Sequence, residues 1–312
     1  MNNEQHQYSR RAFIKRNTTI ALSSSLAYMS IEKVWAAKDN NTKNLTPDTE
    51  LNNGIRMPML GFGTLSLTNT RASTCVAKAI ECGYRHIDTA TLYKNEDAVG
   101  EGLRTSGIDR KKLFITSKVW VADSGYEKTL QAFDRSLNSL GTDYLDLYLI
   151  HRPRGDVQGS WQALEKLYKQ GKITAIGISN FDFSQYNHLK NYAKVKPAVH
   201  QIETHAYFHQ NDAYEHLKKE GIQMEAWSPF AQGRSGLFED KTLAKIGKSY
   251  GKTNAQISLR WHFQRGIIAI PRSSKVEHMK ENLNIFDFTL SDQDMKNIEQ
   301  LDLNKTQFPT WR

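Results

Sequence analysis

The chain has 312 residues, of which 39% are hydrophobic and 24% are charged, and its formal net charge is +9. This composition fits one or two globular domains with a sizeable core. Basic and acidic residues are interspersed, which indicates a solvated basic surface rather than a nucleic-acid partner. The apolar runs are too short for a stable membrane insertion.

The first 50 residues differ in character from the rest. Residues 9–15 (SRRAFIK) resemble the twin-arginine export motif, and a modestly apolar stretch and a cleavage-site pattern follow them. We therefore expect a signal peptide over 1–36 and a flexible linker over 37–50. The expected route is the twin-arginine export machinery, with the periplasm as destination. A chance arginine pair in a tail is the alternative, and it would leave the protein in the cytoplasm.

From residue 51 onward, short apolar runs alternate with segments of helical period. Asn53 and Gly54 form a turn dipeptide, which predicts a short β-hairpin at the start of this region. The later runs are rich in β-branched residues and are bounded by turn or charged residues, as is typical of buried parallel strands. There are eight such runs, at 59–64, 85–90, 113–119, 145–151, 174–179, 198–203, 223–228 and 267–271.

The segments between these runs carry apolar residues on one helical face. Such stripes lie over 72–80, 130–140 and 161–168. Eight strand–helix repeats predict an α/β fold whose parallel sheet closes into a (β/α)8 TIM barrel over 51–312. An open doubly wound sheet is the alternative, but the glycine pair at 61–63 lacks the third glycine of the dinucleotide-binding fingerprint.

Polar residues stand at the carboxyl ends of successive predicted strands, where barrel enzymes carry their chemistry. Asp88 is near the end of the second run, and Tyr93 follows in the loop. Lys118 is near the end of the third run, and His151 ends the fourth. Each residue alone has an ordinary structural explanation, such as a helix cap or a satisfied core histidine. Together they predict an active site, because buried charges are costly unless they are paired.

The motifs around these residues resemble those of the aldo-keto reductase family. The match follows the family order from about residue 51 to residue 302 and is closest to small bacterial members, such as diketogluconate and methylglyoxal reductases. The resemblance implies NAD(P)H-dependent reduction of small aldehydes, dicarbonyls or keto-sugars to alcohols. The motifs are 83–90 (GYRHIDTA), 93–96 (YKNE), 116–120 (TSKVW), 143–151 (DYLDLYLIH), 176–181 (IGISNF) and 270–273 (IPRS).

The resemblance places the catalytic tetrad on Asp88, Tyr93, Lys118 and His151. Hydride addition to a carbonyl carbon leaves an oxyanion, to which Tyr93 would give a proton as general acid. A free phenol has a pKa of about 10, and we expect the Lys118 ammonium to lower that pKa toward neutrality. Asp88 would hold the lysine by an ion pair, and His151 would orient the substrate oxygen.

The resemblance also implies a dinucleotide site. The carboxamide of the nicotinamide would be held by Ser179, Asn180 and Gln201, and Trp227 would stack on the ring. The 2′-phosphate would be met by Arg272 and Ser273. His278 stands where the family usually has arginine, and imidazole lacks the bidentate fork of a guanidinium. We expect NADPH as cofactor, with NADH as the second possibility. The expected contacts are, from nicotinamide to adenine, Ser179, Asn180, Gln201, Trp227, Ser228, Arg272, Ser273, His278, Glu281 and Asn282.

The expected substrate pocket is lined by Leu65, Trp120 and Arg152. Arg152 replaces a tryptophan that is common in the family after the catalytic histidine, so one apolar wall is lost. Arg152 either favours substrates with a carboxylate, a phosphate or several hydroxyls, or turns outward to solvent. The loop after His151 is short, which predicts that a lid covers little of the pocket and that selectivity among substrates is low.

Two other functions are alternatives for this sequence. A non-catalytic dinucleotide-binding regulatory subunit could share the fold, but the intact tetrad argues against it. A zinc site would need regularly spaced ligands, and the cluster of His200, His205, His209 and Glu203 lacks that spacing, so we expect no metal. The expected partners are a carbonyl substrate and the export machinery, and we expect a monomer.

Overall fold

The computed structural model describes residues 46–311, in which strands and helices alternate along the chain. The predicted signal peptide lies outside the described residues, as does most of the predicted linker. Within the described part, no helix is both long and apolar enough to cross a membrane.

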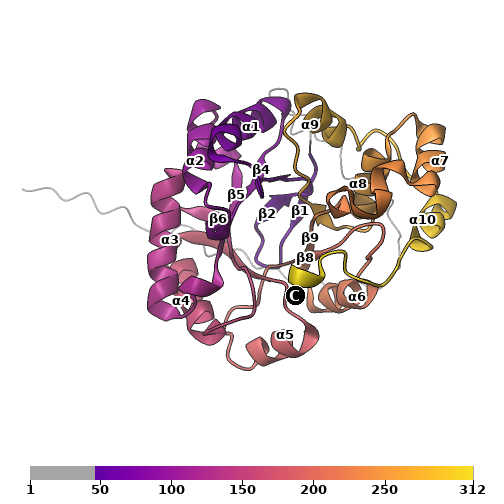
Figure 1. Cartoon of the computed structure of the whole chain (residues 1–312). Helices are drawn as coiled ribbons and strands as arrows, with labels where there is room; N and C mark the ends of the chain where they lie inside the picture. The colour runs from indigo at the N-terminus through magenta and orange to yellow at the C-terminus, as the bar shows by residue number, and fades with distance from the viewer. Residues whose placement is uncertain (1–45, 312) are drawn as a thin grey trace, which may run out of the picture. The chain divides into compact units, whose positions relative to one another are not determined.

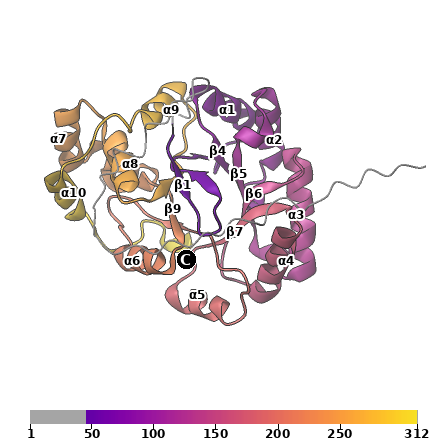
Figure 2. The same ribbon diagram turned by 180° about the vertical axis from the view of Figure 1, so that it is seen from behind.

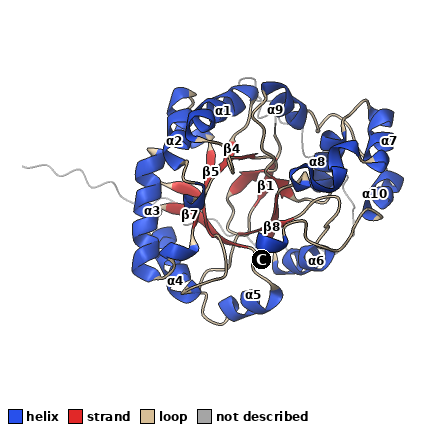
Figure 3. Cartoon of the chain, viewed as in Figure 1, coloured by secondary structure: helices blue, strands red, loops and turns tan. Residues whose placement is uncertain are grey.

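Eight parallel strands form one sheet in chain order, surrounded by helices (Figure 3). A parallel bridge between Leu60 and Ala269 joins the first strand to the last, and Gly63 donates its N–H to the carbonyl of Pro271 beside it. The predicted (β/α)8 barrel is therefore confirmed, with every predicted strand present. The strand predicted at 174–179 begins one residue earlier, and the other seven are shorter than predicted. The strands are β3 (Phe62–Gly63), β4 (His86–Asp88), β5 (Phe114–Val119), β6 (Leu145–Ile150), β7 (Ile173–Ser179), β8 (Val199–Glu203), β9 (Gln223–Trp227) and β10 (Ile268–Ala269).

Residues 147–150 of β6 alternate between two apolar cores, because successive side chains point to opposite faces of a sheet. On β6, Leu147 and Leu149 join the cluster inside the barrel. Tyr148 and Ile150 belong instead to the larger cluster between the sheet and the helices. Only every second residue of a strand therefore points into the barrel interior. A slip of one residue in the strand register would exchange the inward and outward side chains.

The helices pack around the outside of the sheet (Figures 1 and 2). The stripe predicted at 72–80 is confirmed, since its apolar residues are all buried on α1. The helices are α1 (Asn69–Cys82), α2 (Glu96–Thr105), α3 (Tyr126–Leu140), α4 (Val157–Lys169), α5 (Phe183–Lys190), α6 (Asn211–Glu220), α7 (Lys241–Tyr250), α8 (Asn254–Gln264), α9 (Val276–Leu283) and α10 (Asp292–Glu299).

The predicted hairpin pairs β1 (Asp48–Glu50) with β2 (Arg56–Pro58) in antiparallel register. Its turn side chains Asn52 and Asn53 donate to the carbonyls of Pro197 and Thr174, near the amino ends of β8 and β7. The hairpin therefore covers the amino-terminal end of the barrel and leaves the opposite end open. The linker prediction over 37–50 was wrong for its last three residues: their polar composition resembles a linker, but pairing with β2 orders them as a strand.

Candidate active site

The four residues of the predicted tetrad meet at the carboxyl end of the barrel. Asp88 is the last residue of β4, and Tyr93 ends a short 3-10 helix, Thr91–Tyr93, that follows it. Lys118 lies near the end of β5, and His151 follows β6 directly. Ile87 and Val119 pack with the helices, so strand alternation turns Asp88 and Lys118 into the barrel.

The tetrad is built around the buried ammonium of Lys118. Its Nζ lies 2.6 Å from Oδ1 of Asp88, 2.9 Å from the carbonyl oxygen of Thr89 and 3.4 Å from the hydroxyl of Tyr93. The His151 ring meets the Tyr93 ring edge to face, with centroids 5.8 Å apart. Trp120 contacts the same imidazole at 5.1 Å, so the ring is held between two aromatic side chains.

Burial and charge set the protonation states of these groups. Burial raises the pKa of Tyr93, and the opposing effect of the Lys118 charge is too small to reverse that rise. The expected lowering toward neutrality is therefore wrong for this structure, because desolvation of the phenolate outweighs its attraction to the ammonium. Tyr93 is protonated at neutral pH and can act as a proton donor.

The protonation states of Lys118 and His151 complement that of the protonated Tyr93. Burial lowers the pKa of Lys118, but the negative charges facing it, Asp88 first, raise it further than burial lowers it. Burial also lowers the pKa of His151 well below its usual value, and the Lys118 charge adds to this effect. His151 is therefore a neutral imidazole that can donate one N–H hydrogen bond.

A second layer of polar residues lies inside the barrel beneath the tetrad. The Gln201 amide nitrogen donates to Oδ2 of Asp88 and to Oε2 of Glu225, both at 2.9 Å. On the far side of Glu225, Oε1 lies 3.6 Å from Nε2 of His86. Sequence reasoning missed Glu225 and His86. Their signal is a charged or imidazole residue at an inward position of a buried strand.

A groove of about 330 Å³ opens above the tetrad. Twelve predicted site residues line it, including Tyr93, His151 and Leu65, and Lys118 lies buried below. Glu281 and Asn282, predicted at the adenine, are on α9 but do not line the groove. The remaining predicted lining residues are Asp88, Ser179, Asn180, Gln201, Trp227, Ser228, Arg272, Ser273 and His278.

One end of the groove presents a donor and an acceptor side by side. The amide of Asn180 is engaged, because its nitrogen donates to Ser179 Oγ and to the carbonyl of His151, and its oxygen accepts from the Trp227 indole at 2.8 Å. Ser179 therefore keeps its hydroxyl hydrogen to donate. The side chain of Gln201 has only its carbonyl oxygen left to bind a ligand, since both of its amide hydrogens are donated to carboxyl groups.

The backbone at this end is strained. Asn180 and Ser228 have φ of 62° and 51°, in the left-handed region that non-glycine residues seldom adopt. Asn180 follows the end of β7, and Ser228 follows the end of β9. Residues in this conformation cluster at ligand sites, where the surrounding structure holds them.

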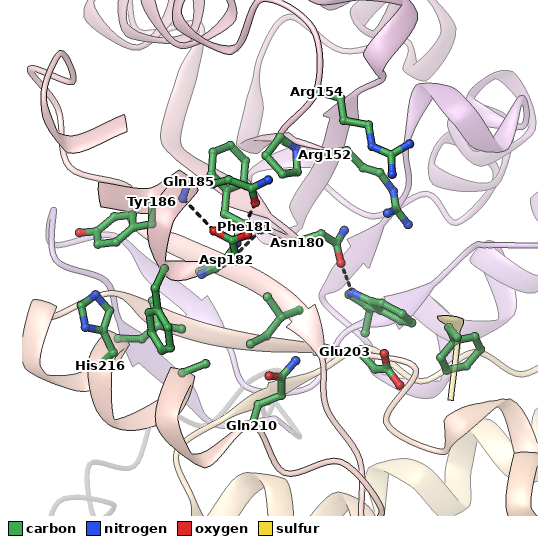
Figure 4. Close-up of a pocket in the computed structure, with 18 residues that line it drawn as sticks. Arg152, Arg154, Asn180, Phe181, Asp182, Gln185, Tyr186, Glu203, Gln210 and His216 are labelled. Atoms are coloured by element: carbon green, nitrogen blue, oxygen red, sulfur yellow. Dashed lines mark hydrogen bonds between the residues drawn. The ribbon is translucent and has the colours of Figure 1, made fainter. Parts of the chain in front are cut away.

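A second cavity of about 370 Å³ adjoins the groove and shares Asn180 and Trp227 with it. Arg152 and Arg154 lie at the end near Asn180, and Tyr186 and His216 lie at the other end (Figure 4). Arg152 is 7% exposed, so the alternative in which it turns outward to solvent is wrong. Together with Trp120, whose ring contacts that of His151, the two arginines also line a third hollow.

The three histidines of the cluster with Glu203 make separate hydrogen bonds, one of them within the cluster. His200 accepts from the N–H of Phe181, His205 pairs with Glu203 at 3.0 Å, and His209 bonds to the carbonyl of Ala206. Across residues 46–311, no three His, Cys, Asp or Glu side chains are grouped closely enough to hold a metal ion.

Comparison with known proteins agrees with this architecture. Over 260 residues the chain is 48% identical to a glyoxal reductase of Bacillus subtilis, covering 83% of this chain and 94% of that protein. It is 38% identical over 259 residues to the methylglyoxal reductase DkgA of Escherichia coli, covering 82% of this chain and 94% of that protein.

Solved structures give the same result. An aldo/keto reductase from Brucella melitensis superposes with a TM-score of 0.79 at 44% identity, covering 82% of this chain and all of that chain. An aldo-keto reductase of Bombyx mori in complex with NADP superposes with a TM-score of 0.80 at 32% identity, covering 84% of this chain and 94% of that chain. Residues 59–303 match the aldo/keto reductase family. The chain belongs to the aldo/keto reductase family and is an oxidoreductase of the carbonyl-reducing type.

Proposed function

We propose that the protein reduces small aldehydes, dicarbonyls or keto-sugars to alcohols with NADPH, and that Tyr93 supplies the proton. The observation that carries the proposal is the position of a protonated Tyr93 hydroxyl, 3.4 Å from a buried ammonium, at the wall of a groove that also holds His151. NADPH would supply the hydride.

The groove residues fit a nicotinamide carboxamide. That group offers a carbonyl oxygen and an NH₂, which complement the Ser179 hydroxyl and the Gln201 carbonyl oxygen. Asn180 acts here by fixing Ser179 and the Trp227 ring rather than by its own free atoms. The Trp227 ring lines the same groove and is held from behind by Phe308 at 5.1 Å, which suits it to support an aromatic ring.

The residues of this chain divide the remaining chemistry between them. His151, as a neutral donor, orients the carbonyl oxygen of the substrate. Tyr93 then gives its proton to the developing alkoxide, which is a far stronger base than a phenolate. Lys118 stabilises the resulting phenolate, and Asp88 keeps the ammonium in place.

The direct test is dinucleotide oxidation by the purified protein across neutral dicarbonyls, aromatic aldehydes and acidic keto-sugars. We expect carbonyl-dependent oxidation of NADPH and slower oxidation of NADH. Tight NADPH binding without oxidation by any of these carbonyls would instead identify a non-catalytic dinucleotide-binding subunit.

Cofactor preference should respond to His278. Arg272, Lys275 and His278 line one stretch of the groove, and we assign it to the 2′-phosphate of NADPH. His278→Arg adds a bidentate donor, so we expect the KM for NADPH to fall by about tenfold relative to the KM for NADH. Steady-state kinetics with both cofactors measure the ratio. An equal change in both constants would remove this residue from phosphate recognition.

Arg152 is proposed to favour substrates with a carboxylate or several hydroxyls. It is buried beside His151 and lines two adjoining hollows. Loss of a charge-assisted hydrogen bond is expected to raise the KM for acidic keto substrates by about tenfold or more in Arg152→Trp. The KM for neutral aromatic aldehydes should fall or stay constant. If both classes of substrate weaken equally, the residue has only a structural role.

Export through the twin-arginine route is proposed from the order of three sequence features, namely the motif at 9–15, the apolar stretch after it and the cleavage-site pattern. Fractionation of cells producing the full chain should recover the protein in the periplasm. Replacing both Arg10 and Arg11 by lysine should retain it in the cytoplasm. Recovery of the unaltered chain in the cytoplasm would refute the export proposal.

A further inference from the structure

Glu225 is a buried carboxyl group that the proposed chemistry does not use. It lies in the middle of β9 with its side chain fully buried inside the barrel, since Met224 and Ala226 on either side pack with the helices. Its Oε1 has no hydrogen-bond partner among residues 46–311. An unpartnered buried polar atom is costly, so the position calls for an explanation.

The hydrogen bond that Glu225 does make leads to the tetrad. Strand register pairs Gln201 of β8 directly with Glu225, and the Gln201 amide nitrogen lies 2.9 Å from Oε2. The other hydrogen of that amide goes to Asp88, which in turn holds the ammonium of Lys118. Glu225 thus fixes which way the Gln201 amide faces.

The charges around Glu225 favour its neutral form. The titratable groups that face it are His86 and Asp88 from β4, Lys118 from β5, and Tyr93 beyond them. Oxygens of Asp88 and Glu225 lie 2.9 Å from one nitrogen, which puts them within about 6 Å of each other. Burial, and then the Asp88 charge, raise the pKa of Glu225 to about 8.

We propose that Glu225 is a positioning residue of the reductase site, which acts through the Gln201 amide on Asp88 and on the bound dinucleotide. By accepting one amide hydrogen, it leaves the carbonyl oxygen of Gln201 for the carboxamide. This inference rests on the proposed function. Without that acceptor, the hydrogen bond to Asp88 alone holds the Gln201 amide. Rotation of the more weakly held amide would point a donor at the donor NH₂ of the carboxamide.

Two substitutions separate position from charge. Glu225→Met removes the acceptor at similar volume, and we expect about a tenfold rise in the Kd for NADPH, measured by fluorescence, together with a lower kcat. Glu225→Gln keeps an acceptor oxygen but cannot ionise, so it should rescue most of the loss in Kd. Glu96→Gln is the matched control, since Glu96 is also buried but bonds to Ser117 and Ser136 outside the site.

The pH profile gives a readout that a purely structural role would not move. Ionised Glu225 places a negative charge near Tyr93, which raises the pKa of the phenol and weakens it as an acid. We expect kcat/KM for reduction by the wild type to fall as pH rises through about 8. Glu225→Gln should lack this alkaline limb, and Glu96→Gln should retain it.

Thermal unfolding tests the same group without turnover. Folding raises the pKa of Glu225 from 4.5 to about 8. The contribution of this group to the free energy of unfolding is therefore fully present below pH 4.5 and is lost as pH rises toward 8. The Tm of Glu225→Gln minus that of the wild type should therefore increase across this window. Glu225→Met shares the increase, because it cannot ionise either.

The outcomes distinguish this inference from the proposed function. The role of Glu225 is overturned if a folded Glu225→Met has the Kd and kcat of the wild type, or if the wild type and Glu225→Gln have identical pH profiles. If Tyr93→Phe is inactive at the same time, the proposed reductase function still stands. If Glu225→Met does not fold, the profile of Glu225→Gln decides. Full activity of Tyr93→Phe would instead overturn the proposed function, and this inference with it.

Discussion

Tyr93→Phe is expected to lower kcat for carbonyl reduction by about a thousandfold or more, while the Kd for NADPH stays within about twofold. Among the proton donors of the tetrad, the Tyr93 hydroxyl can be removed without changing how the aromatic ring packs. Phenylalanine keeps the edge-to-face contact with His151, at 5.8 Å between centroids, so the groove should keep its shape. The measurement combines steady-state turnover with dinucleotide binding by fluorescence.

Two results would contradict the assignment of the proton donor to Tyr93. Turnover of Tyr93→Phe near that of the wild type would move the role to another group, with His151 as the nearest alternative. A large loss of NADPH affinity would show that the hydroxyl serves binding. Trp120→Phe is a useful control, because it alters another aromatic contact of His151 without removing a titratable group.

Lys118→Met is expected to abolish turnover to a similar degree, and also to destabilise the fold. Its ammonium bonds to Asp88 at 2.6 Å, and both side chains are buried. Removing one partner of a buried pair leaves an uncompensated charge, at a cost of about 3 kcal/mol in unfolding free energy. The phenol of Tyr93 would also lose the charge that opposes the rise in its pKa.

A double variant separates the two effects of Lys118. In Lys118→Met/Asp88→Asn no carboxylate remains without a partner, so the melting temperature should recover toward the wild-type value. Turnover should not recover, because the phenolate formed in the reaction still lacks its cation. Recovery of turnover together with stability would reduce Lys118 to a structural role.

The barrel and the tetrad could be predicted because both depend on local patterns. Strand–helix alternation fixes the fold, and the ends of β4, β5 and β6 bring Asp88, Lys118 and His151 together in any closed parallel barrel. The hairpin could be predicted from its turn, but not the start of β1, because Asp48–Glu50 has no strand-like composition and is ordered by its partner strand.

The direction of the pKa shift of Tyr93 could not be predicted from the sequence. Both the ammonium beside the phenol and the burial of the phenol act on it, and only the structure shows that burial is the larger effect. The buried position of Arg152 was likewise open, because a residue after a strand end can face either the cavity or solvent. Glu225 was missed because it lies outside the family motifs, and its only signal is a charged residue at an inward position of a buried strand.

Reduction with NADPH carrying deuterium at both C4 positions is the sharpest test of hydride transfer in the groove above Tyr93. With methylglyoxal as substrate, we expect one deuterium on the carbinol carbon of the product alcohol formed by the wild type, and no labelled alcohol from Tyr93→Phe. An alcohol product without deuterium on that carbon, or NADPH oxidation without any alcohol, would contradict hydride transfer in this groove.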